Sequence, residues 1–140
     1  MKLGEIKIQA LMLIFPRADL EYDVEGLDEA VFVLKAHPSY GSYIKSSVGA
    51  INRALSIIEA GGSIAYKRIT HATPNSYVLD VEERIAQIIP YFIKSDLLLS
   101  ESPSESKEAR AIFDTLLARA QAGKEGANSE TVYSQGELFL

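Results

Sequence analysis

One apolar stripe in the middle of this chain constrains its fold more than any other feature. Ile44, Val48, Ile51, Leu55 and Ile58 follow one another at steps of four and three residues, which places them on one face of an α-helix. A strand would turn alternate residues to opposite faces and break up this set. Two glycines follow at 61–62 and supply a C-terminal stop. The fold must therefore contain a long amphipathic helix here.

The same period predicts helices before this one. Apolar residues recur at steps of three and four from Leu3 to Ile14, until Pro16 stops the run. A shorter run from Leu27 to Leu34 ends at His37-Pro38.

Two further helices are expected after residue 79. Asp80 with Glu83 resembles a capping box, and the apolar face that follows reaches Leu97, although Pro90 should kink or split this helix. The last helix is expected to begin with Pro103 in its first position and Ser102 as its N-cap. Glu105 then stands at the capping-box position. That helix is expected to end near Gly123. Its predicted buried face is Ala109, Ile112, Phe113, Leu116 and Leu117.

Residues 63–79 differ in composition from the helical segments. The first part contains residues that favour a strand, namely Ile64, Tyr66 and Ile69. A loop is expected at residues 71–75, which contain Pro74, and a second strand at residues 77–79. The sequence predicts a small β-hairpin. Two strands alone are marginal in water, so the hairpin should pack on the helices or pair with another chain.

The predicted fold is mainly α, a compact bundle of about four to five helices with the hairpin inserted. The length of 140 residues, with 47% hydrophobic and 24% charged, suits one globular domain, which we place at 1–122. Residues 123–140 are rich in Gly, Ser, Glu and Asn and hold no period, so they are predicted to form a flexible tail. The tail carries apolar residues that are unusual for a free segment, among them Tyr133, Leu138 and Phe139.

Composition argues against several classes of function. The net charge is −5, and the longest basic cluster is Lys67-Arg68, too little for specific nucleic-acid binding. No cysteine is present, which excludes disulfides and thiolate zinc sites. The apolar run from Ala10 to Phe15 is too short to span a membrane. The start of the sequence does not match the pattern of a signal peptide. We expect a location inside a cell.

No catalytic or metal-binding pattern stands out. The two histidines, His37 and His71, each lie in a Pro-containing segment without a second ligand four residues on. The glutamates are explained by caps and solvated helix faces, and no serine stands in a nucleophile pattern. We therefore predict no enzyme activity, no metal and no cofactor.

The candidate functional residues are instead surface contacts. Asn52 and Arg53 lie off the stripe of the middle helix, and they are either an ordinary solvated face or a subunit contact, since Arg is enriched at interfaces. The predicted hairpin adds Tyr66 and Arg68, and the tail adds the apolar residues named above. All are predicted to contact another protein.

Three segments resemble a known family. Residues 49–59 read GAINRALSIIE, residues 88–98 read IIPYFIKSDLL, and residues 108–114 read EARAIFD after an acidic Ser/Pro link. Together they resemble the small head-tail connector, or head-completion, proteins of tailed phages and prophages, over roughly residues 1–120 in helix order. The segments are not a motif that chemistry fixes, so no functional residues are carried over.

The resemblance implies a structural role. Such proteins are helical and form a homo-oligomeric ring beneath the portal, joining head to tail while DNA passes through the centre; a monomer in free solution is compatible with this. The implied partners are portal and tail or adaptor proteins, in the bacterial cytoplasm during assembly and then in the virion. The alternative is a small intracellular adaptor or regulatory protein with a single partner, whose only candidate helix-turn-helix lies around Pro38–Gly41.

Overall fold

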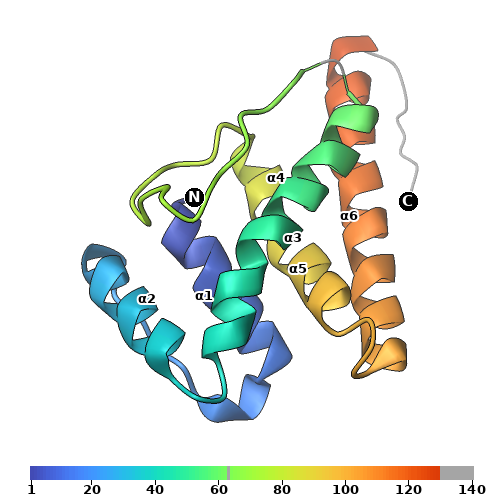
Figure 1. The fold of residues 1–140 in the computed structure, drawn as a ribbon. Coiled ribbons are helices and arrows are strands. Elements are labelled where there is room, and N and C mark those ends of the chain that lie inside the picture. The colour runs from blue at the N-terminus through green and yellow to red at the C-terminus, as the bar shows by residue number, and fades with distance from the viewer. Residues whose placement is uncertain (63, 130–140) are drawn as a thin grey trace.

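The computed structural model describes residues 1–62 and 64–129 as a bundle of helices (Figure 1). The prediction of a mainly helical fold is confirmed. The elements in chain order are α1 (Leu3–Ile14), the 3-10 turns η1 (Pro16–Ala18) and η2 (Val24–Gly26), α2 (Leu27–Ala36), α3 (Gly41–Ala60), α4 (Glu83–Ala86), α5 (Ile89–Leu97) and α6 (Pro103–Ser129).

Helix α1 is buried around most of its circumference. Leu3, Ile6 and Ala10 join the larger core cluster, to which α3, α5 and α6 also contribute. Ile8 and Leu11 join a second cluster with α2 and the start of α3. The single apolar stripe predicted for this helix would serve only one core, whereas α1 connects two.

A close backbone contact sets the turn from α2 to α3. Helix α2 ends before His37-Pro38, as predicted. Gly41 then opens α3 against α2, and a Cβ at this position would lie 2.4 Å from the carbonyl oxygen of Lys35. Only glycine has room there. The predicted stripe of α3 is buried along its whole length, each residue being at most 6% exposed.

Pro90 splits the predicted fourth helix into α4 and α5, because it lies in the first turn of α5, where no backbone donor is needed. The predicted capping box of Asp80 with Glu83 is wrong. Helix α4 begins at Glu83 with Glu82 as its N-cap residue, and the Glu83 carboxylate accepts a hydrogen bond from the amino group of Met1 (2.7 Å).

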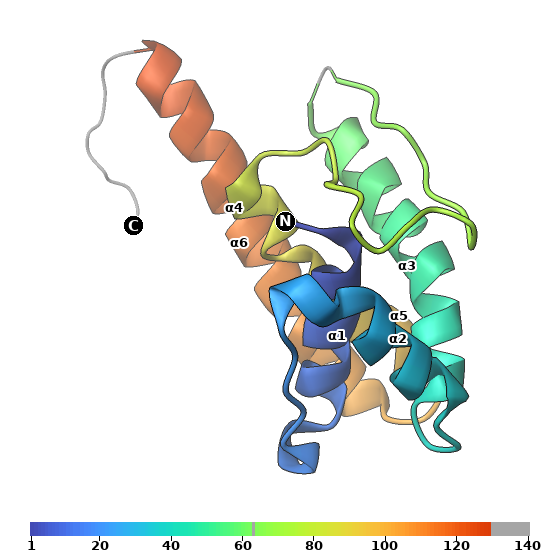
Figure 2. The ribbon, with the colours of Figure 1, turned by 90° about the vertical axis from the view of Figure 1, so that its left-hand side faces the viewer.

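Helix α6 begins at Pro103, as predicted, with Ser102 hydrogen-bonded to Glu105 (3.0 Å). It runs past Gly123 to Ser129, so the helix enters the segment predicted to be a flexible tail. Ile112, predicted to be buried, is 41% exposed. Figure 2 shows the C-terminal turns of α6 projecting beyond the other helices.

The prediction of a β-hairpin at 63–79 is wrong. Among the described residues there is no strand, and Val78 forms only one isolated antiparallel bridge, with Lys2. The carbonyl of Tyr77 accepts a hydrogen bond from the Leu3 N–H (2.7 Å). The segment is a loop that runs back along α3 and crosses the start of α1 (Figure 2). Its peptide groups form local turns, such as Thr73 N–H to the Thr70 carbonyl, and contacts with the start of α1, but no strand-to-strand ladder among the described residues.

Candidate functional site

Asn52 fastens the loop to α3. Its Nδ2 donates to the carbonyl oxygen of Ile69 (2.9 Å), and its Oδ1 accepts from the Ile69 N–H (2.9 Å). Ile69 is only 3% exposed, so its peptide groups need partners inside the protein. One amide side chain therefore replaces the strand partner that a hairpin would have supplied.

Arg68 makes a second connection between the loop and α3. Its guanidinium donates to both carboxylate oxygens of Glu59 (2.7 and 2.8 Å) and to the hydroxyl of Ser56 (3.0 Å). Glu59 also accepts from the N–H of Tyr66. The Arg68 guanidinium, helped by this N–H, lowers the pKa of Glu59 to about 2.

Arg53 joins two helices. From α3 its Nη2 lies 2.5 Å from the Asp96 carboxylate of α5, and its Nε donates to the same group (3.1 Å). This two-point geometry aligns α3 with α5. The side chain stays 57% exposed, so its outer edge still faces solvent.

Tyr66 is half-buried and packs against the main core. Burial, followed by nearby carboxylates, raises its pKa. The structure thus places Asn52, Tyr66 and Arg68 together at the contact of the loop with α3. Their role in contacts with another protein stays a prediction. Tyr133, Leu138 and Phe139 lie outside the described residues.

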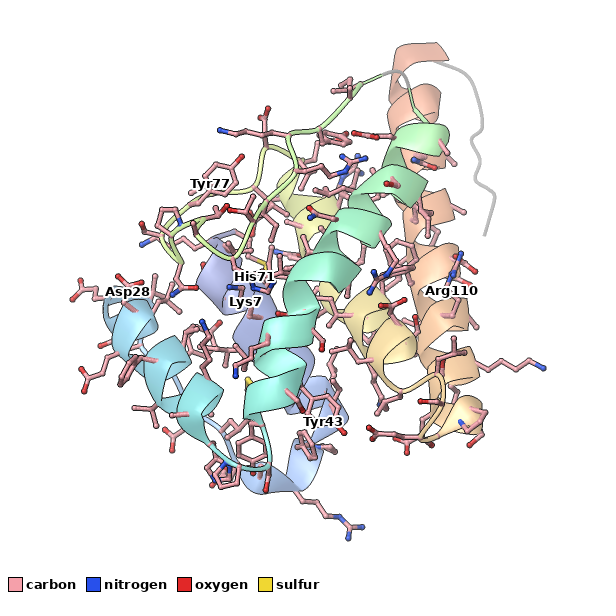
Figure 3. All side chains as sticks on the ribbon, viewed as in Figure 1. Lys7, Asp28, Tyr43, His71, Tyr77 and Arg110 are labelled. Carbon is pink, nitrogen blue, oxygen red and sulfur yellow. The ribbon has the colours of Figure 1, made fainter. Side chains whose placement is uncertain are left out.

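A cavity of about 190 Å³ lies between α1, α2, α3 and the loop. Its charged lining is mainly basic: Lys7, Lys35 and Lys45, with His71, face it together with one carboxylate, Asp28. Figure 3 shows Lys7 and His71 next to each other between α2 and α3. Sequence reasoning missed this site, although a lysine flanked by Ile6 and Ile8 within a buried helix was a signal that could have found it.

A second hollow, of about 440 Å³, lies between α5 and α6. Phe92 and Leu99 give it an apolar wall, and Arg110 lies over the Phe92 ring, 5.3 Å from its centre. Lys107 also lines it and forms no ion pair with a described residue. We call this hollow the α5–α6 groove.

Exposed apolar side chains lie on several elements. Phe32 and Val33 are neighbours on α2 and are 73% and 58% exposed, and Leu99, at the edge of the α5–α6 groove, is 67% exposed. Figure 1 shows α2 and α6 at opposite sides of the bundle. Contiguous exposed apolar patches are typical of protein contact surfaces.

Within the described part of the chain, no group of His, Cys, Asp and Glu side chains is arranged to hold a metal ion. No helix there is both long and apolar enough to cross a membrane. The described residues form a small helical bundle with exposed apolar side chains on α2 and at the edge of the α5–α6 groove. Comparison with family models, curated proteins and solved structures finds no match to the chain.

Proposed function

We propose that this protein is a head-tail connector of a tailed phage or prophage, one subunit of a ring that joins the portal to the tail. The three segments that resemble this family lie in the C-terminal half of α3, over the whole of α5 and within the first half of α6. Ile51, Phe92 and Phe113 from these segments meet in one core cluster. The segments that carry the resemblance therefore contribute to the packed core of the domain.

The observation that carries the proposal is the pair of unlike apolar faces on opposite sides of the bundle. A ring of identical subunits needs two different surfaces, each matching the other, so that every copy binds the next in the same way. Phe32 and Val33 on α2 form a projecting face, and the α5–α6 groove, with Leu99 at its edge, forms a receiving one.

The charges of the two faces also match. Asp28 and Glu29 lie one helical turn before Phe32 and Val33 and are exposed on α2. Lys107 in the α5–α6 groove is exposed and has no described acidic partner. Opposite charges at the edge of an apolar contact fix its orientation and speed its formation.

Electron microscopy of the protein mixed with the portal ring of the same phage or prophage tests the proposal. We expect an added ring of density beneath the portal. Phe32→Ser should remove this density, whereas Val78→Ser, which alters another exposed apolar side chain on the loop, should leave it. Bare portals with the unmodified protein would overturn the proposal and favour an adaptor or regulator with a single partner.

A further inference from the structure

Lys7 is a buried charge that has no opposite charge beside it among the described residues. It is 7% exposed, on a helix whose neighbouring residues belong to the two cores. Its Nζ reaches only one described acceptor, the Oδ1 of Asn75, at 3.5 Å. An ammonium group has three donors, and burying it unpaired is costly. The group therefore lacks the partners that would normally keep a lysine in such a place.

The surroundings of Lys7 add positive charge. Lys35 from α2 and Lys45 from α3 line the same cavity, and His71 of the loop borders it. Of the described residues in the lining, Asp28 is the one carboxylate, and it accepts a hydrogen bond from the Nδ2 of Asn75 (3.1 Å). Burial, together with the charge of Lys35, lowers the pKa of Lys7, as expected for a cation that has no anion beside it.

We infer that this cavity binds a small oxyanion, a phosphate or carboxylate group, with Lys7 at its base and Lys35 and Lys45 at its sides. Among the described lining residues, three lysines face one carboxylate, which leaves an excess of two positive charges when the lysines are protonated. Lysine ammonium groups are common phosphate ligands that act as point charges. The cavity, at about 190 Å³, has room for much more than a water molecule. Thr73 and Asn75 in the lining supply further polar groups.

Asp28 and Phe32 line this cavity and also belong to the α2 face of the proposed connector contact, so the anion is tested on the isolated chain, where failure of the connector proposal would leave the result unchanged. Inorganic phosphate and acetate are therefore titrated into the protein alone at constant ionic strength, with chloride as the baseline. Calorimetry, phosphorus NMR for phosphate, and the midpoint of thermal unfolding report binding. We expect phosphate, acetate or both to bind and to raise the midpoint above that in chloride. Whichever binds more tightly identifies the anion class.

Lysine variants test whether the anion binds in this cavity. Lys7→Met should weaken binding roughly tenfold or more, as for the loss of a buried charged hydrogen bond. Lys35→Met, at an exposed position that should not disturb folding, should weaken it about twofold to fivefold. Lys107→Met makes the same charge change in the α5–α6 groove and should bind like the unmodified protein. Absence of binding, or equal binding by Lys35→Met and Lys107→Met, would overturn the inference even if Lys7→Met failed to fold.

Discussion

At the scale of single residues, the position of the loop depends most on Asn52. In Asn52→Ala both peptide groups of Ile69 lose their partners at a site that is 3% exposed. We expect the free energy of unfolding, measured with urea, to fall by about 2 kcal/mol. Ser42→Ala, an exposed change on the same helix, should alter it by less than about 0.5 kcal/mol. Equal effects of the two changes would mean that the loop does not rest on this amide.

The Glu59 carboxylate should make the free energy of unfolding depend on pH in the acid range. Its folded pKa, about 2, lies below the ordinary value of 4.5, so its ion pair with Arg68 contributes fully above pH 4.5 and is lost as the pH falls toward 2. The difference in unfolding free energy between the unmodified protein and Glu59→Gln should therefore be constant near neutral pH and shrink across this window. Urea unfolding at several pH values measures it. A difference that does not change with pH would contradict the contact with Arg68.

Two glycines should respond to alanine in opposite ways. Gly41→Ala would place a Cβ 2.4 Å from the Lys35 carbonyl oxygen, a backbone atom that cannot move aside, and should lower stability by about 1–3 kcal/mol. At Gly49 the nearest atom is the Arg53 guanidinium, 3.2 Å away, at the end of a flexible side chain. Gly49→Ala should therefore stabilise α3 by up to about 1 kcal/mol. Thermal unfolding of both variants checks the sign of each change.

At the scale of elements, two local signals predicted helix boundaries correctly. Pro90 removes a backbone donor and splits α4 from α5, and α6 begins at Pro103, with the Ser102 hydroxyl donating to the Glu105 carboxylate. Both effects need only a few neighbouring residues, so they can be read from the sequence. The end of α6 was less predictable, because Gly123 only lowers helix propensity and does not forbid a helix.

The wrong prediction of a hairpin shows that local sequence patterns do not reveal contacts between residues far apart in the chain. Strand formers such as Ile69 favour an extended backbone but do not choose its partner. Here that partner is the side chain of Asn52, seventeen residues earlier, and nothing in the spacing of the two residues indicates it. The pairing of Arg53 with Asp96, forty-three residues apart, is equally invisible. The sequence therefore marked residues of interest on α3 without showing that they bind the protein's own loop and helices.

At the scale of the whole molecule, burial on two sides explains why Lys7 was overlooked. A period analysis assigns one face of a helix to the core and the other to solvent. Helix α1 has core on both sides, so a lysine that would ordinarily reach water faces a cavity. Only the arrangement of α1, α2, α3 and the loop brings Lys7 together with Lys35, Lys45 and His71.

The contact between copies can be tested by cross-linking, since the chain has no cysteine. If α2 of one copy lies in the α5–α6 groove of the next, Glu29→Cys and Lys107→Cys on separate chains should form a disulfide when mixed at high concentration under oxidising conditions. Each variant alone should give fewer cross-links, because like positions do not meet in a head-to-tail contact. Gel electrophoresis without reductant measures the yield.

Adding Phe32→Glu to the Glu29→Cys chain should weaken the contact roughly thirtyfold and slow the initial rate of cross-linking at concentrations below the Kd, because an aromatic anchor at the centre of such a contact is worth at least about 2 kcal/mol. Asp80→Cys in place of Glu29→Cys provides a matched exposed acid outside the contact and should give only random cross-links. A contact between two copies of the same face would instead make Glu29→Cys cross-link best with itself. That result would rule out a ring closed through α2 and the α5–α6 groove, because such a symmetric contact ends at a dimer.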